Sequence, residues 1–295
     1  MWRICLGKSE RRLLKTSFMK YFKDQLSRLV RSRRALAIPV TYLILFVSLI
    51  ALISLTYSFA ITRISSRGAL LKASVARHNI EILDDAVRSV LWSYGASKVV
   101  SMDDCGGTFR TTLNARKLVL NFTDERSPGA IVFNNTIGKA LYELEPSTFG
   151  DDGLYVRGDD RVIINETRYT ITQLYVATGN STKNIILCYR PLATVVAIGT
   201  SNGKPLNLVR VYVVNLNTSQ SLMLTERFCL KVTSTNTTVA AYQYTFTSSI
   251  PSVAIKAVLD GRHMNVRLPL SSSSDGAVVK LEVVVCNVKI QSVEV

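Results

Sequence analysis

The sequence predicts an α+β protein in which a long N-terminal helix, transmembrane at first and amphipathic further on, precedes a mainly antiparallel β-sandwich. Three observations lead to this prediction. An uncharged run extends from Ala35 to Thr62, apolar residues then recur at helical spacing, and the chain beyond Lys98 is rich in β-forming residues. We expect four regions, namely a basic cytoplasmic leader at 1–35, a transmembrane helix at 36–62, an amphipathic extension at 63–98 and an extracellular domain at 99–295.

The uncharged run begins directly after Arg34 and ends directly before Arg63. It is longer than the roughly 20 apolar residues that cross about 30 Å of hydrocarbon in a bilayer. A core helix of a soluble domain is also apolar, but it rarely stays uncharged over such a length. The run therefore predicts one membrane-spanning helix.

Basic residues are distributed unequally about this run. The segment up to Arg34 holds eleven basic and two acidic residues, whereas the basic residues after the run are sparser, at Arg63, Arg67, Lys72 and Arg77. Cytoplasmic flanks carry the excess of Lys and Arg. We therefore expect a single-pass protein of the cell membrane, with its N-terminus in the cytoplasm and its C-terminal domain outside the cell.

Six N-glycosylation sequons agree with this orientation, because all of them follow the run and none precedes it. Their acceptor residues are Asn121, Asn134, Asn165, Asn180, Asn217 and Asn236. A chain rich in Ser and Thr produces some sequons by chance, so their placement weighs more than their number. The pattern predicts a glycoprotein.

The net charge of +15 suggests nucleic-acid binding only until it is divided by region. The segment up to Arg34 contributes +9 and residues 99–295 contribute +3. No basic patch with interleaved aromatic residues accompanies the charge, as nucleic-acid binding would require. We therefore expect a membrane as the partner of the basic segment, and no nucleic acid.

After the span, small and apolar residues recur in alternating steps of four and three, which places them on one face of a helix. They are Ala69, Ala73, Ala76, Ile80, Leu83, Val87, Val90 and Tyr94. The other faces are expected to carry the polar residues, Asn79, Asp84 and Asp85 among them. The helix should therefore continue to about Tyr94, with Gly95 as its C-cap.

Beyond Lys98, segments rich in Val, Ile, Thr and Tyr alternate with turn residues such as Asn202-Gly203 and Asp275-Gly276. Short strands at this spacing are typical of an antiparallel sandwich. The last segment is apolar, so we expect a paired strand there. The predicted strands are residues 117–122, 130–133, 161–164, 169–176, 184–189, 206–216, 228–232, 239–246, 253–259 and 277–295.

The cysteines divide by compartment. Cys5 lies in the leader, where a reduced thiol is expected. The other four lie in the exterior domain, where disulfides persist; they are Cys105, Cys188, Cys229 and Cys286. We expect at least one disulfide among them, although the sequence favours none of the three pairings. Four separately buried thiols are the alternative.

The leader has two features that leave its processing open. Met19 offers a shorter start, and the sequence does not decide between Met1 and Met19. A secretory signal peptidase cuts after the apolar region, where Ser58-Phe-Ala60 would suit it, and that cut would release a soluble domain.

The border between leader and span reads Arg33-Arg34-Ala35-Leu36-Ala37-Ile38-Pro39. It resembles the class III signal peptide of archaeal type IV pilin-like proteins, in which a prepilin peptidase cuts after a Gly or Ala preceded by basic residues. The resemblance implies a cut after Ala35, with Leu36 as the new N-terminus and Pro39 in the first helical turn. Val40 stands where bacterial pilins carry Glu, so the likeness is to the archaeal branch.

The sequence holds no motif for catalysis. His78 and His263 have no partner at metal-ligand spacing, and neither a GxSxG motif nor a P-loop nor a GxGxxG motif is present. The segments Phe149-Gly-Asp-Asp-Gly153 and Arg157-Gly-Asp-Asp-Arg161 pair carboxylates that suit a Ca²⁺ ion, but such segments are more often solvated turns. We expect no enzyme, no cofactor and no metal.

Two functions remain after these exclusions. The first, which the resemblance implies, is a structural subunit or minor pilin of a type IV pilus-like surface filament. Its partners would be the prepilin peptidase and copies of itself or related subunits, bound through the N-terminal helix. The second is a single-pass cell-surface binding or envelope protein with a glycosylated β-sandwich. Loss of the leader favours the first function, and its retention favours the second.

Overall fold

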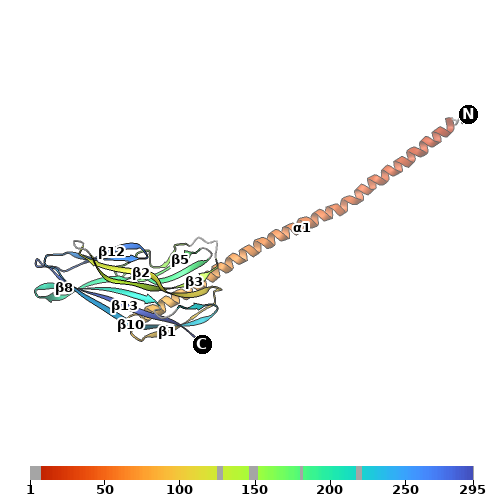
Figure 1. Ribbon diagram of the computed structural model, residues 1–295. Coiled ribbons are helices and arrows are strands. Elements are labelled where there is room, and N and C mark those ends of the chain that lie inside the picture. The colour runs from red at the N-terminus through yellow and green to blue at the C-terminus, as the bar shows by residue number, and fades with distance from the viewer. Residues whose placement is uncertain (1–7, 125–128, 146–151, 180–181, 217–220, 295) are drawn as a thin grey trace, which may run out of the picture. The chain divides into compact units, whose positions relative to one another are not determined.

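The computed structural model of the chain describes residues 8–124, 129–145, 152–179, 182–216 and 221–294, with side chains from Pro39 onward. The chain divides into two units, Met1–Ser65 and Ser66–Val295. One helix, α1 (Lys8–Val90), begins in the first unit and ends in the second (Figure 1).

The described strands of the second unit form two sheets (Figure 1). A five-stranded sheet has, in spatial order, β1 (Ser97–Met102), β10 (Phe228–Thr245), β13 (Val278–Val293), β8 (Lys204–Leu216) and β7 (Leu192–Ser201). An eight-stranded sheet has β12 (Arg262–Pro269), β11 (Ser252–Leu259), β2 (Thr108–Thr123), β3 (Ala130–Leu144), β6 (Lys183–Tyr189), β5 (Thr172–Thr178) and β4 (Tyr155–Arg157), with β9 (Met223–Leu224) paired to β2.

This unit is β-rich and mostly antiparallel, as the sequence predicts. The sheets are curled half-barrels, and the predicted β-sandwich is not confirmed. One strand pair departs from the antiparallel pattern, because β13 runs parallel to β8. β13 is paired on its other side with β10, so the last apolar segment is a paired strand, as predicted.

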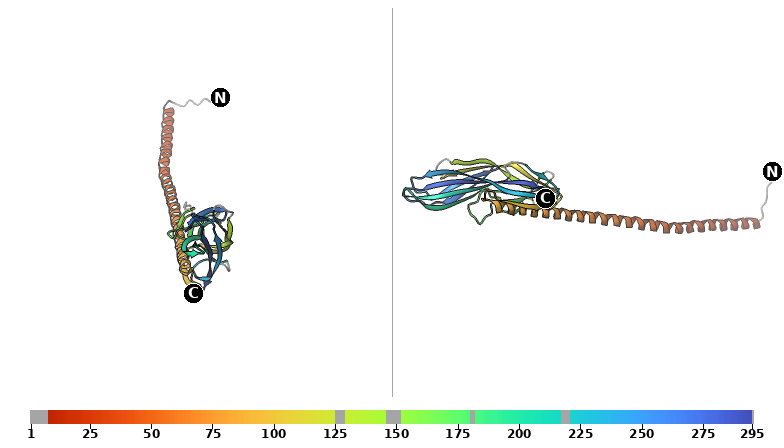
Figure 2. Two further views of the ribbon diagram at one scale, coloured as in Figure 1. Left: turned by 90° about the vertical axis from the view of Figure 1, so that its left-hand side faces the viewer. Right: turned by 90° about the horizontal axis from the view of Figure 1, so that it is seen from below.

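Of the three hydrophobic clusters among the described residues, the two larger ones form most of the core of the second unit. In one, the buried face of α1 packs with residues of both sheets, among them Tyr142, Leu187 and Val288. Figure 2 shows the last turns of α1 lying along the strands. In the other cluster the two sheets pack on each other without the helix, through residues such as Leu120 and Val211. The helix is thus part of the core of this unit.

Several strand predictions differ from the structure. The two segments at 228–232 and 239–246 belong to the single strand β10, which continues through a bulge between Ser234 and Asn236. The segment at 161–164 makes only an isolated bridge, from Ile164 to Leu192. Strands β1, β4, β7, β9 and β12 were not predicted. Of these, β12 alternates Met264, Val266 and Leu268 with polar residues, so its sequence does carry the period-2 signal of a half-buried strand.

Candidate functional site: the apolar helix and its anchor in the β-rich unit

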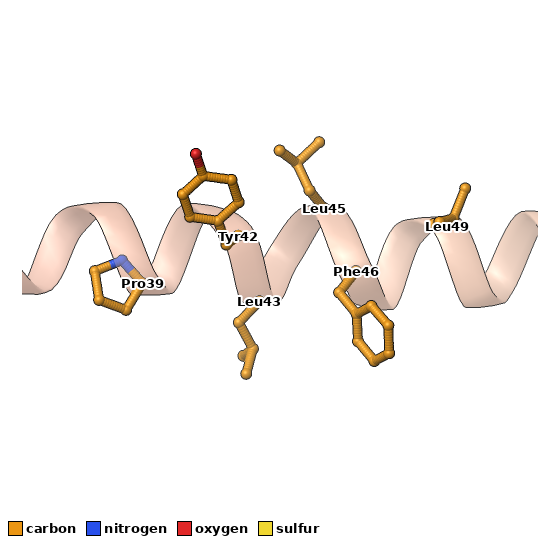
Figure 3. Close-up of a pocket in the computed structure, with 6 residues that line it drawn as sticks. All are labelled: Pro39, Tyr42, Leu43, Leu45, Phe46 and Leu49. Carbon is orange, nitrogen blue, oxygen red and sulfur yellow. The ribbon is translucent and has the colours of Figure 1, made fainter.

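In the first unit, the apolar part of α1 is exposed on all sides. Large apolar side chains from Val40 to Ile61 are 47% to 74% exposed, and those of Tyr42, Leu43, Leu45, Phe46 and Leu49 project from both sides of the helix (Figure 3). The stretch beginning at Pro39 is long and apolar enough to cross a membrane. The predicted span is therefore a helix with exposed apolar side chains along its whole length from Val40 to Ile61.

Three hydroxyl groups within this stretch bond to the backbone of the helix itself. The hydroxyls of Ser48, Thr56 and Thr62 donate hydrogen bonds of 2.8–2.9 Å to backbone carbonyls three or four residues earlier. A bilayer offers no water to replace such bonds. At the end of the run the Arg63 guanidinium lies 5.2 Å from the ring centre of Phe59, a cation–π contact. These features suit an apolar solvent around the helix.

The four residues that the resemblance assigns to processing lie within α1. They are Arg33, Arg34, Ala35 and Leu36, and their side chains lie outside the part of the chain that the structure describes in full. Pro39 lies inside the helix, where a proline removes one backbone donor.

In the second unit, α1 buries the predicted apolar face. Ala76, Ile80, Leu83 and Val87 are fully buried, and Val90 is 2% exposed. The prediction that this face extends to Tyr94 is wrong, because α1 ends at Val90 and the Tyr94 side chain is 80% exposed. The chain leaves the helix through Trp92, which has a positive φ of 65°, and through Gly95 at 76°.

Two polar residues expected on the outer faces of the helix are instead buried in the core. Asp84 is fully buried and receives three contacts. Arg157 Nη1 lies 2.7 Å from Oδ2, while Thr172 Oγ1 and Tyr189 Oη each donate to Oδ1 at 2.8 Å. Three segments of the eight-stranded sheet thus hold one carboxylate of the helix.

Asn79 ties the helix to the loop after β1. Its Nδ2 donates to the carbonyl of Asp103 at 2.7 Å and to Tyr142 Oη at 3.3 Å. Its Oδ1 accepts from the backbone N–H of Asp103 at 3.2 Å. The side chain thereby satisfies both backbone groups of Asp103 next to the buried helix face.

The surroundings of Asp84 and Arg157 shift the pKa values of Asp85 and Tyr189 in different ways. A hydrogen bond from Arg157 is the main reason why the pKa of Asp85 is lowered. The contact between Asp85 and Arg157 therefore stabilises the folded unit at pH values above 3.8, the ordinary pKa of aspartate. This stabilisation is lost as the pH falls through the lowered pKa of Asp85. Burial, followed by the charge of Asp84, raises the pKa of Tyr189 well above its ordinary value, so its hydroxyl remains a donor.

The predicted disulfide is not found. Cys105, Cys188, Cys229 and Cys286 are all free thiols, and Cys5 lies outside the described residues. β10 and β13 are neighbours, but the register pairs Cys229 with Val293 and Cys286 with Thr237. The two cysteines are thus eight residues out of register, which is about 26 Å along a strand. A disulfide needs Cα atoms within about 7 Å.

The remaining two thiols are buried in different places. Cys188 is fully buried and accepts a contact of 2.9 Å from Arg116 Nη1. Burial raises its pKa, and the guanidinium acts in the opposite direction. Cys105 belongs to the cluster around α1, and burial raises its pKa too. Desolvation of this kind favours the thiol over the reactive thiolate.

The sequons fall into distinct environments. Asn134, Asn165 and Asn236 are exposed. Asn121 is half-buried in β2, which is paired on both sides, and Thr123 of the same sequon is 4% exposed. Asn180 and Asn217 lie outside the described residues. Of the four sequons whose asparagine the structure describes, three are thus accessible.

The carboxylates considered for Ca²⁺ are used in other contacts. Asp159 pairs with the fully buried Arg190, and Asp160 lies 3.2 Å from Arg262. Asp152 accepts from the backbone N–H of Thr178, and residues 149–151 lie outside the described part. Among the described residues no cluster of three His, Cys, Asp or Glu side chains is placed to hold a metal.

Comparison of the chain with protein-family models, with curated proteins and with solved structures finds no match.

Proposed function

We propose that the protein is a pilin-like structural subunit or minor pilin of a type IV pilus-like surface filament, processed after Ala35. The observation that carries this proposal is the apolar stretch of α1, which is exposed on every side from Val40 to Ile61. Such a helix needs either lipid or other helices around it. Copies of the same helix, packed as a bundle, would supply the second environment.

The energy of this assembly would come from the helix. Removing one large apolar side chain from water contributes about 1.5–3 kcal/mol. The helix carries more than a dozen such side chains in the exposed stretch. Transfer from lipid to a helix bundle gains less, because lipid tails are as apolar as leucine and only packing differs. Assembly from the membrane would therefore depend on close helix packing.

The position of Pro39 supports cleavage after Ala35. In the full chain Pro39 lies inside α1 and costs one helical hydrogen bond. After the proposed cut it would be the fourth residue of the mature chain. The first four N–H groups of a helix have no intrahelical partner, so the missing donor would then cost nothing.

The β-rich unit would be the exterior part of the subunit, a glycosylated sandwich-like coat around the helix bundle. The exposure of Asn134, Asn165 and Asn236 supports this placement. A second candidate is a membrane-anchored cell-surface binding protein. It is favoured by the fact that one apolar helix of this length is sufficient to hold a domain at a membrane. Neither role calls for catalysis.

Processing is tested by changing the residues that a prepilin peptidase would read. Ala35→Leu would overfill the pocket for a small residue, and Arg33→Glu with Arg34→Glu would reverse the charge beside the scissile bond. We expect both variants to accumulate as the longer precursor and to be missing from filaments, while Ala51→Leu in mid-span is processed normally. The measurement is the intact mass and N-terminal sequence of protein from the native membrane. An unprocessed N-terminus in the wild type would contradict the pilin function and favour the anchored binding protein.

Orientation is tested separately. Protease added to intact cells should remove residues 99–295, because the excess of basic residues before the span places this region outside. A cytoplasmic protein of the same cells serves as the control for lysis. Degradation of the β-rich unit only after the cells are broken would contradict the proposed orientation.

A further inference from the structure

Two strands of the second unit each leave one edge open. Residues 236–245 of β10 pair with β13 only, because β1 ends its pairing with β10 at Thr233. Residues 130–137 of β3 pair with β2 only, because pairing with β6 begins at Ala140. Tyr242 Oη donates to the carbonyl of Val132 at 3.3 Å and so connects the two strands. We call these two segments the open seam.

The open seam lacks the features that normally protect a free strand edge. Its segments read AIVFNNTI and NTTVAAYQYT, without a charged residue or a proline. Ile131 is 62% exposed, Val239 57% and Tyr242 38%. Free edges of this kind present unpaired backbone groups and pair readily with another chain unless charge, proline or a cover prevents it.

Each strand of the open seam carries an exposed sequon. Asn134 lies in the β3 segment and Asn236 at the start of the β10 segment. The side chain of Asn236 is held by a ladder of side-chain amides. Asn215 Nδ2 donates to Asn287 Oδ1 at 3.0 Å, and Asn287 Nδ2 donates to Asn236 Oδ1 at 2.9 Å. This bond uses the oxygen of Asn236 and leaves Nδ2, the atom that N-glycosylation modifies, outside it.

We propose that N-linked glycans on Asn134 and Asn236 cover the open seam and keep two copies of the chain from pairing edge to edge. The inference rests on the proposed exterior location of the unit. The donor is a lipid-linked oligosaccharide phosphate. A bond forms between Nδ2 and the anomeric carbon, the bond from that carbon to the phosphate oxygen breaks, the lipid phosphate leaves with the electron pair, and Nδ2 gives up one proton to a base.

The seam explains why these two sequons matter more than Asn165. Without a cover, the β10 segment of one copy can pair antiparallel with the same segment of a second copy in a two-fold arrangement. The absence of charge in both segments removes the repulsion that would oppose this pairing. Asn165 lies outside both segments and donates to the carbonyl of Arg267, so a glycan there would leave the seam uncovered.

The test uses the full-length protein made in its native host. Asn134→Gln combined with Thr238→Ala removes both sequons, and Thr238→Ala keeps the Asn236–Asn287 hydrogen bond. Asn165→Gln is the matched control. Glycopeptide mass spectrometry measures occupancy, and size-exclusion chromatography in detergent measures self-association. We expect sugars on both seam sequons of the wild type and a shift of the double variant alone to dimers and larger species. Adding Ala241→Lys on the free edge should reverse that shift.

The outcomes separate this inference from the proposed function. Occupancy at Asn165 with none at Asn134 and Asn236 overturns the seam inference and leaves the exterior location standing. No sugar at any sequon overturns the inference as well, and the protease experiment then decides the location. Equal self-association of the double variant and Asn165→Gln, with the wild-type seam glycosylated, also overturns it, as does a dimer that Ala241→Lys leaves unchanged.

Discussion

Replacing Asp84 with alanine is expected to destabilise the β-rich unit by about 3–5 kcal/mol, because it removes the fully buried carboxylate of an ion pair and leaves two buried hydroxyls without their acceptor. Arg157 would keep only the exposed Asp85 of its two carboxylate partners, and the hydroxyls of Thr172 and Tyr189 would lose their shared acceptor. Tyr189 is 1% exposed, so water cannot easily replace the lost bond. The helix would thereby lose this polar connection to β5 and β6 and one of its two contacts with Arg157 of β4.

Urea unfolding of the full chain in detergent measures this effect. The near-ultraviolet circular dichroism of the packed aromatic side chains, among them Phe109 and Tyr142 with ring centres 5.4 Å apart, follows the loss of tertiary structure around α1. Asp85→Ala is the matched control, because its carboxylate is 57% exposed and contacts the same guanidinium. An exposed pair contributes about 0–1 kcal/mol. Equal midpoints for the two variants would mean that Asp84 is not the anchor that its burial indicates.

The sequence predicts the helix better than its anchor. An uncharged run and a four-three spacing are strong signals, and the structure has the helix and the buried face from Ala76 to Val90. Asp84 was placed with the polar residues by its charge alone. It stands four residues after Ile80 and three before Val87, so the same spacing already places it on the buried face. What the sequence cannot supply is the partner, Arg157, which lies 73 residues away.

The sheets are predicted less well, because their pairing depends on contacts distant in sequence. Ser234 to Thr238 resembles a turn, yet the chain stays extended there because β13 pairs with it across the bulge. The disulfide prediction failed for a related reason. Compartment and cysteine count indicate that a disulfide is chemically allowed, whereas the register of β10 and β13 decides whether two thiols meet. Register is set by which faces of the paired strands are buried and by the turns between them, so the number and compartment of the cysteines say nothing about it.

A second large effect is expected at Gly138, where two strands from different sheets touch. A Cβ at this position would lie 2.1 Å from the carbonyl oxygen of Leu216 and 3.2 Å from that of Thr112. Both neighbours are backbone atoms of strands, so neither can rotate away. The backbone N–H of Gly138 also donates to Asn215 Oδ1 at 3.0 Å, which begins the amide ladder.

We therefore expect Gly138→Ala to destabilise the β-rich unit by about 3 kcal/mol or more, at the upper end of overpacking costs, because β3 and β8 must separate to admit the methyl group. Gly68→Ala is the matched control. Nothing lies within 4 Å of the Cβ that it would add to α1, and alanine is favoured over glycine in a helix by about 1 kcal/mol. Urea midpoints of the two variants should therefore move in opposite directions from the wild type. A Gly138→Ala midpoint within error of the wild type would show that β3 and β8 do not approach each other as closely as described.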